Sequence, residues 1–324
     1  MQIDLVNRLV RCPQCGRSEW KSADAATLRC PCGGRMAVDG PVVLSPEAAA
    51  NDAARFYAAA GGTHLANVRF ADNVQVSSAT RAYRRCLDEW FPQRLGTVVD
   101  LGCGDGRITR WAMEKGAITV VALDFIKANL DAVRSTASAV GFPGELLLVG
   151  AGVVDGFLRP AAFDTVLCFE VLSYLCGAKD RVDVLRSLRT LLKPGGTLVL
   201  SEFPRHGRVL ADVVAMNVDN MRRTAFQGKR LEKSAATSVE VTHPTLEELR
   251  QDCAAAGFTV VEARGVSPIS MLFQHAYNFT SYPLRPPLDA EMQRIIERLE
   301  DGSCEPCELS RNVVLRLQDS GQCL

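Results

Sequence analysis

Four cysteines crowd into the first tenth of this 324-residue chain: Cys12, Cys15, Cys30 and Cys32. They form a C-x2-C pair, a spacer of fourteen residues, and a C-x-C pair that two glycines follow. Two close pairs on tight turns can place four thiolates tetrahedrally around Zn²⁺. The second pair is one residue shorter than usual, so another ligand in place of Cys32 is one alternative, and four reduced, buried cysteines are the other. A segment this short has no core of its own for burying thiols, which favours a structural zinc site.

A glycine loop follows a predicted buried strand at residues 97–101, in the sequence TVVDLGCGDGR. A second apolar run, residues 119–123, ends on Asp124. Glycines at the carboxyl end of a strand let the backbone approach a ligand, and an acid after the next strand can bind both ribose hydroxyls. The spacing therefore predicts a nucleoside site.

A dinucleotide site is the alternative for this loop. It would need Gly or Ala at position 107, where Arg107 stands. Asp100, before the first glycine, suits a cationic ligand better than a pyrophosphate. Both residues count against the dinucleotide interpretation.

The pattern D-x-G-x-G-x-G with a downstream acid resembles the class I S-adenosylmethionine-dependent methyltransferases. The run LRSLRTLLKPGGTLVLSEF, residues 185–203, is also typical of that family. The resemblance covers roughly residues 80–318 and implies S-adenosylmethionine as the cofactor. It assigns cofactor contacts to these residues: Asp100, Gly102, Gly104, Gly106, Asp124, Phe125 and Glu170.

The chain departs from the family after the predicted third strand, residues 145–149. An acid usually accepts from the adenine amino group there, whereas this turn reads Gly150-Ala151-Gly152. Asp155 from a shifted loop and a backbone carbonyl are the two replacements that we consider.

The family's chemistry is an in-line displacement of a methyl group from a sulfonium, in which bringing the two centres together contributes most. A base is needed only where the acceptor atom must lose a proton. The predicted catalytic residues are Glu202 and His206, beyond the fifth strand, and Tyr174, after the fourth. His243 and His275 are further candidates, against the plainer alternative that they pack or face solvent.

The elements that must position these residues define an α/β fold. The resemblance implies a Rossmann-like seven-stranded sheet, six strands parallel and one antiparallel, flanked by helices. Residues 1–44 resemble the zinc ribbons found beside some methyltransferases. We expect a helical connector or cap over residues 45–95 and a methyltransferase core over residues 96–324, with a substrate lid inserted at about residues 204–243.

The lid is the most basic part of the chain. Between Arg205 and Lys233 there are seven Lys/Arg against three acids, a balance of +4. This positive charge would suit binding of a phosphate or carboxylate on the acceptor, or contact with an RNA backbone. A solvated helix face is the plainer alternative.

The amino-acid composition of the chain bears on the class of acceptor. The chain has 37 Lys and Arg residues and 37 Asp and Glu residues, and aromatic residues make up 6% of it. Neutral charge and few aromatics favour a small-molecule acceptor over RNA. The alternative is an rRNA methyltransferase of the guanine-N1 type, which also couples a zinc ribbon to this core, and a third reading is a non-catalytic partner protein.

The sequence also bears on location and on the remaining cysteines. No apolar run reaches the length of a membrane span, and we expect a cytoplasmic protein. Cys86, Cys168, Cys176 and Cys253 are predicted to be core residues. Cys304, Cys307 and Cys323 receive no role, and the oligomeric state is not predicted.

Overall fold

The computed structural model describes residues 3–39, 42–44, 74–151, 157–174, 177–233, 238–266 and 309–321, with a few isolated positions between 267 and 308. Several predicted residues lie outside these ranges: Asp155, Cys176, His275, Cys304, Cys307, Cys323 and most of the connector. None of the described helices is both long and apolar enough to cross a membrane.

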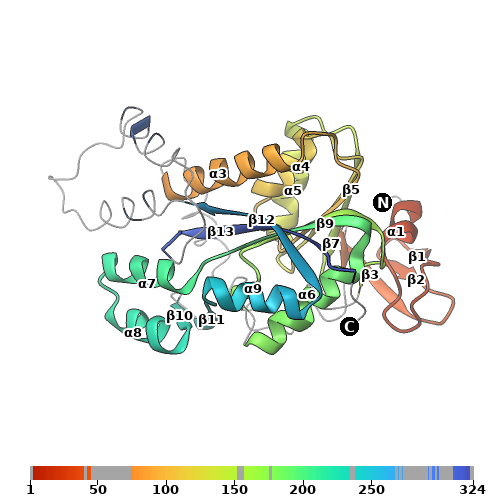
Figure 1. Cartoon of the computed structure of the whole chain (residues 1–324). Helices are drawn as coiled ribbons and strands as arrows, with labels where there is room; N and C mark the ends of the chain where they lie inside the picture. The colour runs from red at the N-terminus through yellow and green to blue at the C-terminus, as the bar shows by residue number, and fades with distance from the viewer. Residues whose placement is uncertain are drawn as a thin grey trace.

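A twisted sheet runs through the centre of the molecule (Figure 1). Seven of its strands have the order β7-β6-β5-β8-β9-β13-β12, and β13 is antiparallel to both of its neighbours. This arrangement confirms the predicted six parallel strands and one antiparallel strand. The bounds of the strands are β5 Thr97–Leu101, β6 Thr119–Leu123, β7 Glu145–Gly150, β8 Phe163–Phe169, β9 Leu192–Glu202, β12 Phe258–Val266 and β13 Asn312–Asp319.

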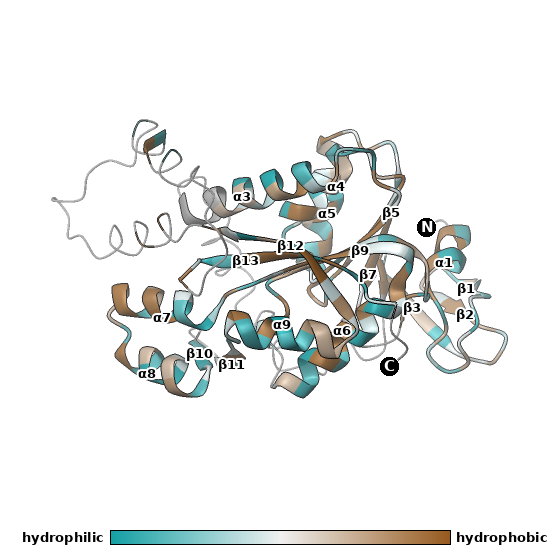
Figure 2. Ribbon diagram, in the orientation of Figure 1, coloured by the Kyte–Doolittle hydropathy of each residue, from teal (hydrophilic) through white to brown (hydrophobic). Residues whose placement is uncertain are grey.

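Helices cover both faces of this sheet (Figure 1). One face carries α3 Val74–Trp90, α4 Arg107–Glu114 and α5 Lys127–Ala139, and the other carries α6 Ala178–Leu191 and α9 Leu246–Ala255. The strands are apolar between the helix layers, whereas the outer helix surfaces are hydrophilic (Figure 2). A capping box of Thr245 and Glu248 begins α9. α3 lies within residues 45–95, where a helical connector is expected.

The strand count differs from the prediction, because the described part of the chain forms a sheet of eleven strands. The four additional strands are β1 Lys21–Asp24, β2 Thr27–Arg29, β3 Arg35–Asp39 and β4 Val42–Leu44. They belong to the cysteine-rich segment, and β4 pairs in parallel with β7. We call residues 3–44 the ribbon. The ribbon therefore continues the central sheet.

A short helix that the sequence did not predict, α1 Ile3–Leu9, begins the ribbon. Its apolar side, Leu5, Val6 and Leu9, is buried in the same core cluster as Trp20 of the ribbon and Val149 of β7. Backbone bonds from Arg11 to Phe157 and from Arg159 to Leu9 join the ribbon to the chain before β8. The ribbon and the rest of the sheet therefore share one hydrophobic core.

The insertion after β9 forms two helices and a hairpin. These are α7 Arg205–Val214, α8 Val218–Gln227, β10 Lys229–Lys233 and β11 Ser238–Thr242. We call this segment the lid. The lid and the ribbon lie at opposite ends of the molecule (Figure 1).

Candidate active site and cysteine cluster

The glycine loop between β5 and α4 is built for close approach of a ligand. Gly102, Gly104 and Gly106 have φ of 66°, 54° and 85°, a region that other residues rarely adopt. A Cβ on Gly102 would lie 2.7 Å from Val171, and one on Gly106 would lie 2.9 Å from Val133. Around Gly104 the structure describes no atom within 4 Å of such a Cβ. The backbone at Gly104 therefore faces open space.

Asp124, at the end of β6, is joined directly to this loop. Its Oδ2 accepts from the Gly104 N–H at 2.9 Å, and its Oδ1 accepts from the Ile126 N–H at 2.8 Å. Asn129 donates a third bond, to Oδ2, at 3.2 Å. Burial raises the pKa of Asp124, and these donors oppose the shift. The predicted acid and the predicted loop thus form one unit at the carboxyl edge of the sheet.

Asp100 lies beneath the loop. Its side chain is 2% exposed and accepts a hydrogen bond from the Thr109 hydroxyl, in the first turn of α4. Burial raises its pKa to about 6, and the nearby charge of Asp124 adds to the rise. This hydrogen bond joins the end of β5 to the first turn of α4. Direct contact between Asp100 and a cofactor stays a prediction.

Glu170 lies at the carboxyl end of β8 in a strained conformation, with a φ of 60°. Its Oε1 accepts from the Tyr83 hydroxyl at 2.7 Å and from Asn312 Nδ2 at 3.5 Å. Burial and this carboxylate raise the pKa of Tyr83 well above its usual value. Helical periodicity in a sequence can indicate that a residue such as Tyr83 is buried, but it does not show a hydrogen bond to a distant residue.

The lid reaches the predicted site through its hairpin. Val239 and Val241 of β11 form a small apolar cluster with Phe125, the residue after Asp124, and with Tyr174. Thr242 donates to the Ser173 carbonyl at 3.5 Å. These contacts bring Phe125 and Tyr174 together under the lid, as expected for the carboxyl ends of β6 and β8.

Glu202, the last residue of β9, is fully buried. One of its oxygens accepts from the Leu172 N–H at 2.6 Å, and the other accepts from the Ser173 hydroxyl. Burial raises its pKa to about 7. Both oxygens are thus bound to the turn that carries Tyr174.

The two described histidines from the predicted set differ in exposure. His206 is exposed in the first turn of α7. His243 is 4% exposed, and its pKa lies well below the usual value because of burial and the charge of Arg208. Of the predicted bases that the structure describes, His206 is therefore the most accessible.

A cluster of aromatic and basic side chains that the sequence analysis missed lies where β9 leaves the sheet. The Arg208 and Arg311 guanidinium carbons lie 5.4 and 5.6 Å from the centroid of the Phe203 ring, and the ring of His243 lies edge-on at 6.2 Å. Arg311 is 3% exposed. Because β9 and β13 are antiparallel with Val313 opposite Glu202, the residues just outside their paired ends must meet. The sequence could have revealed this neighbourhood once the two strands were paired.

A second guanidinium and two carboxylates surround Arg208. Burial and then the charge of Arg230 lower the pKa of Arg208. Arg208 pairs with Glu232 at 3.2 Å, and Arg230 pairs with both Glu232 and Asp212. A buried guanidinium whose pKa falls lies in surroundings that would favour an added anion.

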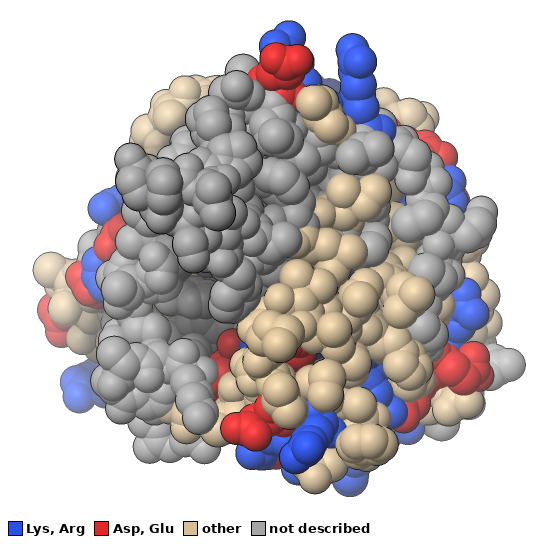
Figure 3. Space-filling view, turned by 90° about the vertical axis from the view of Figure 1, so that its left-hand side faces the viewer, with Lys and Arg blue, Asp and Glu red and all other residues tan. Residues whose placement is uncertain are grey.

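Three other cations of the lid have acidic partners. Arg205 pairs with Glu248, while Arg223 and Lys229 share Glu240. The local balance of +4 is therefore partly neutralised by acids beyond Lys233. On the side of the molecule in Figure 3, the described charges of both signs lie around an uncharged area and form no basic stripe.

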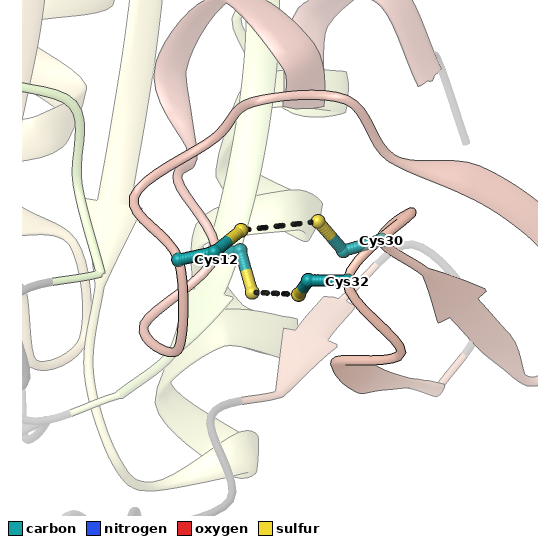
Figure 4. A group of neighbouring side chains, drawn as sticks. Cys12, Cys30 and Cys32 are labelled. Atoms are coloured by element: carbon teal, nitrogen blue, oxygen red, sulfur yellow. Dashed lines mark hydrogen bonds between the residues drawn. The ribbon is translucent and has the colours of Figure 1, made fainter.

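The four ribbon cysteines come together at one point, from two loops (Figure 4). All four Sγ atoms lie within 4.8 Å of one another, with Cys12–Cys32 at 3.7 Å and Cys15–Cys30 at 3.5 Å. A tetrahedral zinc site with Zn–S bonds of about 2.3 Å requires S–S separations of about 3.8 Å, so the cage has the right size.

The backbone of the second cysteine loop also suits a thiolate site. The Gly34 N–H points to Cys32 Sγ at 3.4 Å and lowers the pKa of that thiol to about 7. A Cβ on Gly34 would lie 2.7 Å from Cys12 Sγ. Glycine is therefore required where the two loops meet, which explains one of the two glycines after the cysteine pair.

Comparison with known proteins agrees with this geometry. Residues 99–200 match the family model described as a methyltransferase domain. The ubiquinone biosynthesis O-methyltransferase of Paracidovorax citrulli is 29% identical over 195 residues, which cover 56% of this chain and 76% of that protein. Its namesake from Pseudomonas paraeruginosa is 31% identical over 36% of this chain and 50% of that protein.

Solved structures share the fold. A SAM-dependent methyltransferase from Methanosarcina mazei has a TM-score of 0.50 at 17% identity and covers 72% of this chain and 96% of its own. The 1,6-didemethyltoxoflavin-N1-methyltransferase of Burkholderia thailandensis has a TM-score of 0.50 at 18% identity and covers 93% of this chain and 99% of its own.

The matched domain, the strand order and the loop joined to Asp124 define the class of the protein. It is a class I S-adenosylmethionine-dependent methyltransferase. An N-terminal cysteine cluster of metal-site geometry is built into its sheet.

Proposed function

We propose that this enzyme transfers a methyl group from S-adenosylmethionine to an O, N or C nucleophile of a small molecule that carries an anionic group. The ribbon holds a structural Zn²⁺ through Cys12, Cys15, Cys30 and Cys32. The observation that carries the acceptor assignment is the Phe203 ring flanked by Arg208 and Arg311 beside the cofactor site.

The chain's own residues supply the cofactor site. The open backbone at Gly104 and the carboxylate of Asp124 would hold the ribose and amino-acid parts. Phe125 would lie against the adenosine. Glu170 would lie between the cofactor and the acceptor, at the carboxyl end of β8. When bound, S-adenosylmethionine supplies an electrophilic methyl group on a sulfonium.

The aromatic and basic cluster would orient the acceptor. Phe203 offers a face for an apolar or aromatic ring, and the guanidiniums of Arg208 and Arg311 would bind a carboxylate or phosphate. Holding the acceptor in line with the methyl group is the main catalytic contribution, since effective molarity is worth about 7–11 kcal/mol.

The proton of an acceptor hydroxyl would pass to a side chain at the mouth. His206 is exposed there, and Tyr174 is half-buried under the lid. Glu202 fixes the turn that carries Tyr174, because both of its oxygens bond to that turn. We therefore propose His206 and Tyr174 as the candidate bases and Glu202 as a positioning residue.

The named relatives support a small acceptor. The two bacterial relatives are named for O-methylation in ubiquinone biosynthesis, and the Burkholderia protein is named for N-methylation of a toxoflavin precursor. RNA is the less supported acceptor, since the ribbon lies at the opposite end of the molecule from the lid (Figure 1).

The acceptor class can be tested with methyl-labelled S-adenosylmethionine and cell extract separated into small molecules and RNA. Label in the small-molecule fraction supports the proposal, and label only in ribosomal RNA would overturn it. Matched acceptors that differ by one carboxylate, such as catechol and 3,4-dihydroxybenzoate, test the anionic group.

A variant pair tests the arginine contact. Arg208→Ala should raise the KM for an anionic acceptor at least about tenfold, the effect of losing one charge-assisted hydrogen bond. Arg222→Ala removes an exposed lid cation and should leave that KM unchanged. Equal KM values in the two variants would count against the role of Arg208.

A further inference from the structure

We propose that zinc in the cysteine cluster raises the affinity of the enzyme for S-adenosylmethionine, because the ribbon strand β4 holds the strand that positions Asp124. The inference rests on the proposed zinc and cofactor sites. It assigns the ribbon a positioning role in cofactor binding.

The first step is the pairing of β4 with β7. Val42 lies opposite Leu148, and Val43 lies opposite Val149. Val42 and Val43 are fully buried, and they belong to the core clusters on opposite faces of the sheet. The ribbon strand is thus an interior strand. β7 has a neighbour on both sides only because β4 is present.

The second step leads from β7 to the cofactor loop. The Val149 carbonyl accepts the Asp124 N–H at 3.1 Å. The Asp124 carboxylate in turn accepts the Gly104 N–H at 2.9 Å. A shift of β7 would therefore move the backbone of the ribose-binding acid and its bond to the glycine loop.

The third step is the dependence of β4 on the cysteines. Cys12 follows Val10, which bridges to Leu158 of the core. Cys30 and Cys32 lie between β2 and β3, and β3 pairs with β4. A metal that joins the two loops ties the turn between β2 and β3 to the segment that bridges to Leu158, and β3 in turn pairs with β4. The thiols alone form weak contacts.

An exposed ion pair also links the ribbon to the start of α5. Asp39 lies 3.7 Å from Lys127, with about half of each side chain exposed. Pairs of this kind contribute little, so the strand pairing carries the effect. Lys127→Ala should therefore leave cofactor affinity almost unchanged.

The direct experiment compares zinc-loaded and chelated protein. The dissociation constant of S-adenosylhomocysteine is measured by calorimetry, and circular dichroism checks that the sheet is retained. Removal of zinc should weaken binding at least about fivefold, the lower end of ordinary coupling between sites. Folded, metal-free protein that binds as tightly as before would overturn the proposal.

A second experiment keeps the zinc and disturbs only the strand pairing. Val43→Ala removes two methyl groups where β4 meets β7. Val184→Ala is the control, because it removes two methyl groups from a buried side chain of α6 in the same core cluster. Both variants should lose stability, but only Val43→Ala should bind S-adenosylhomocysteine more weakly. Equal affinities would overturn the proposal even where the metal-free protein unfolds.

Coupling between two binding sites is reciprocal, so the cofactor must affect the binding of zinc as zinc affects the binding of the cofactor. Saturating S-adenosylhomocysteine should raise the zinc affinity, measured by competition with a chromophoric chelator, by the same factor. Purified protein without zinc would reject the metal site itself, and failure of zinc-loaded protein to bind the cofactor product would reject the proposed cofactor site. Both outcomes differ from a failure of the coupling.

Discussion

Asp124 joins three parts of the site through one side chain. It receives N–H groups from Gly104 in the loop, from Ile126 beyond the strand and from Asn129 in α5. The carboxylate is therefore fixed before any ligand arrives. A fixed acid lowers the ordering cost of binding, so its loss should affect affinity more than a flexible contact would.

Asp124→Ala should reduce S-adenosylmethionine binding below detection by calorimetry, because the ribose contact and the loop anchor are lost together. Asp131→Ala is the matched control, since Asp131 is an acid of α5 that forms surface ion pairs with Lys127 and Arg134. Normal binding by Asp124→Ala would mean that the cofactor site is assigned wrongly.

The protonation of Glu202 makes the free energy of unfolding depend on pH. Burial raises its pKa to about 7, whereas the unfolded chain should have a value of about 4.3. Between these values the native carboxyl holds a proton that the unfolded state has released. The free energy of unfolding should therefore fall as pH rises from about 4.5 to 7, by roughly 3 kcal/mol from this group.

Urea unfolding of wild type and Glu202→Gln at pH 5 and pH 7.5 checks this expectation. Glutamine keeps an acceptor for the Leu172 N–H and cannot ionise, so the loss of stability with pH should be smaller in the variant. Asp100, with its pKa raised to about 6, leaves part of the loss in place. An identical loss in both proteins would contradict the buried-acid account.

Among the elements, the ribbon loops depend on residue size at two adjacent positions. Gly33 has a φ of 93° and no described atom within 4 Å of a Cβ, whereas a Cβ on Gly34 would press against Cys12 Sγ. The two adjacent glycines therefore serve different needs, one conformational and one steric.

Gly34→Ala should lower the zinc content well below one per chain, measured by elemental analysis. Gly33→Ala is the matched variant: it strains the turn and should keep the metal, with a cost of about 1 kcal/mol in stability. Full zinc occupancy in Gly34→Ala would argue against a four-thiolate cage of this geometry.

The sequence predicted the elements whose signals are local. The glycine loop at residues 102–106 and the apolar strands predicted at residues 97–101, 119–123 and 145–149 are confirmed in the fold. The seven-stranded order came from the resemblance. The pairing of β4 with β7 could not be predicted, because three apolar residues carry no sign of which sheet edge they will meet. Tyr83, Phe203 and Arg311 were missed for the same reason: their partners are distant in sequence.

At the scale of the whole molecule, the ribbon and the methyltransferase core are one packing unit. Buried residues from α1, β2 and β3 belong to the same cluster as residues of β5, β7, α6 and α9. Strand pairing runs without interruption from β1 to β12.

Scanning calorimetry of zinc-loaded protein should show one cooperative unfolding transition, because a shared core does not divide into independent domains. Chelation should lower its midpoint without splitting it. Two separate transitions, with only the first sensitive to chelation, would show that the ribbon folds independently.

The position of the ribbon also decides what the sheet presents to other chains. Leu147, Leu148 and Val149 of β7 are buried on both faces, and a bare edge of this kind would be a template for aggregation. The ribbon covers it and moves the border of the sheet to β1, a strand of four exposed residues that includes Lys21 and Asp24. Short, charged edge strands resist pairing with foreign strands, so β1 is a less favourable template for such pairing than a bare β7 would be.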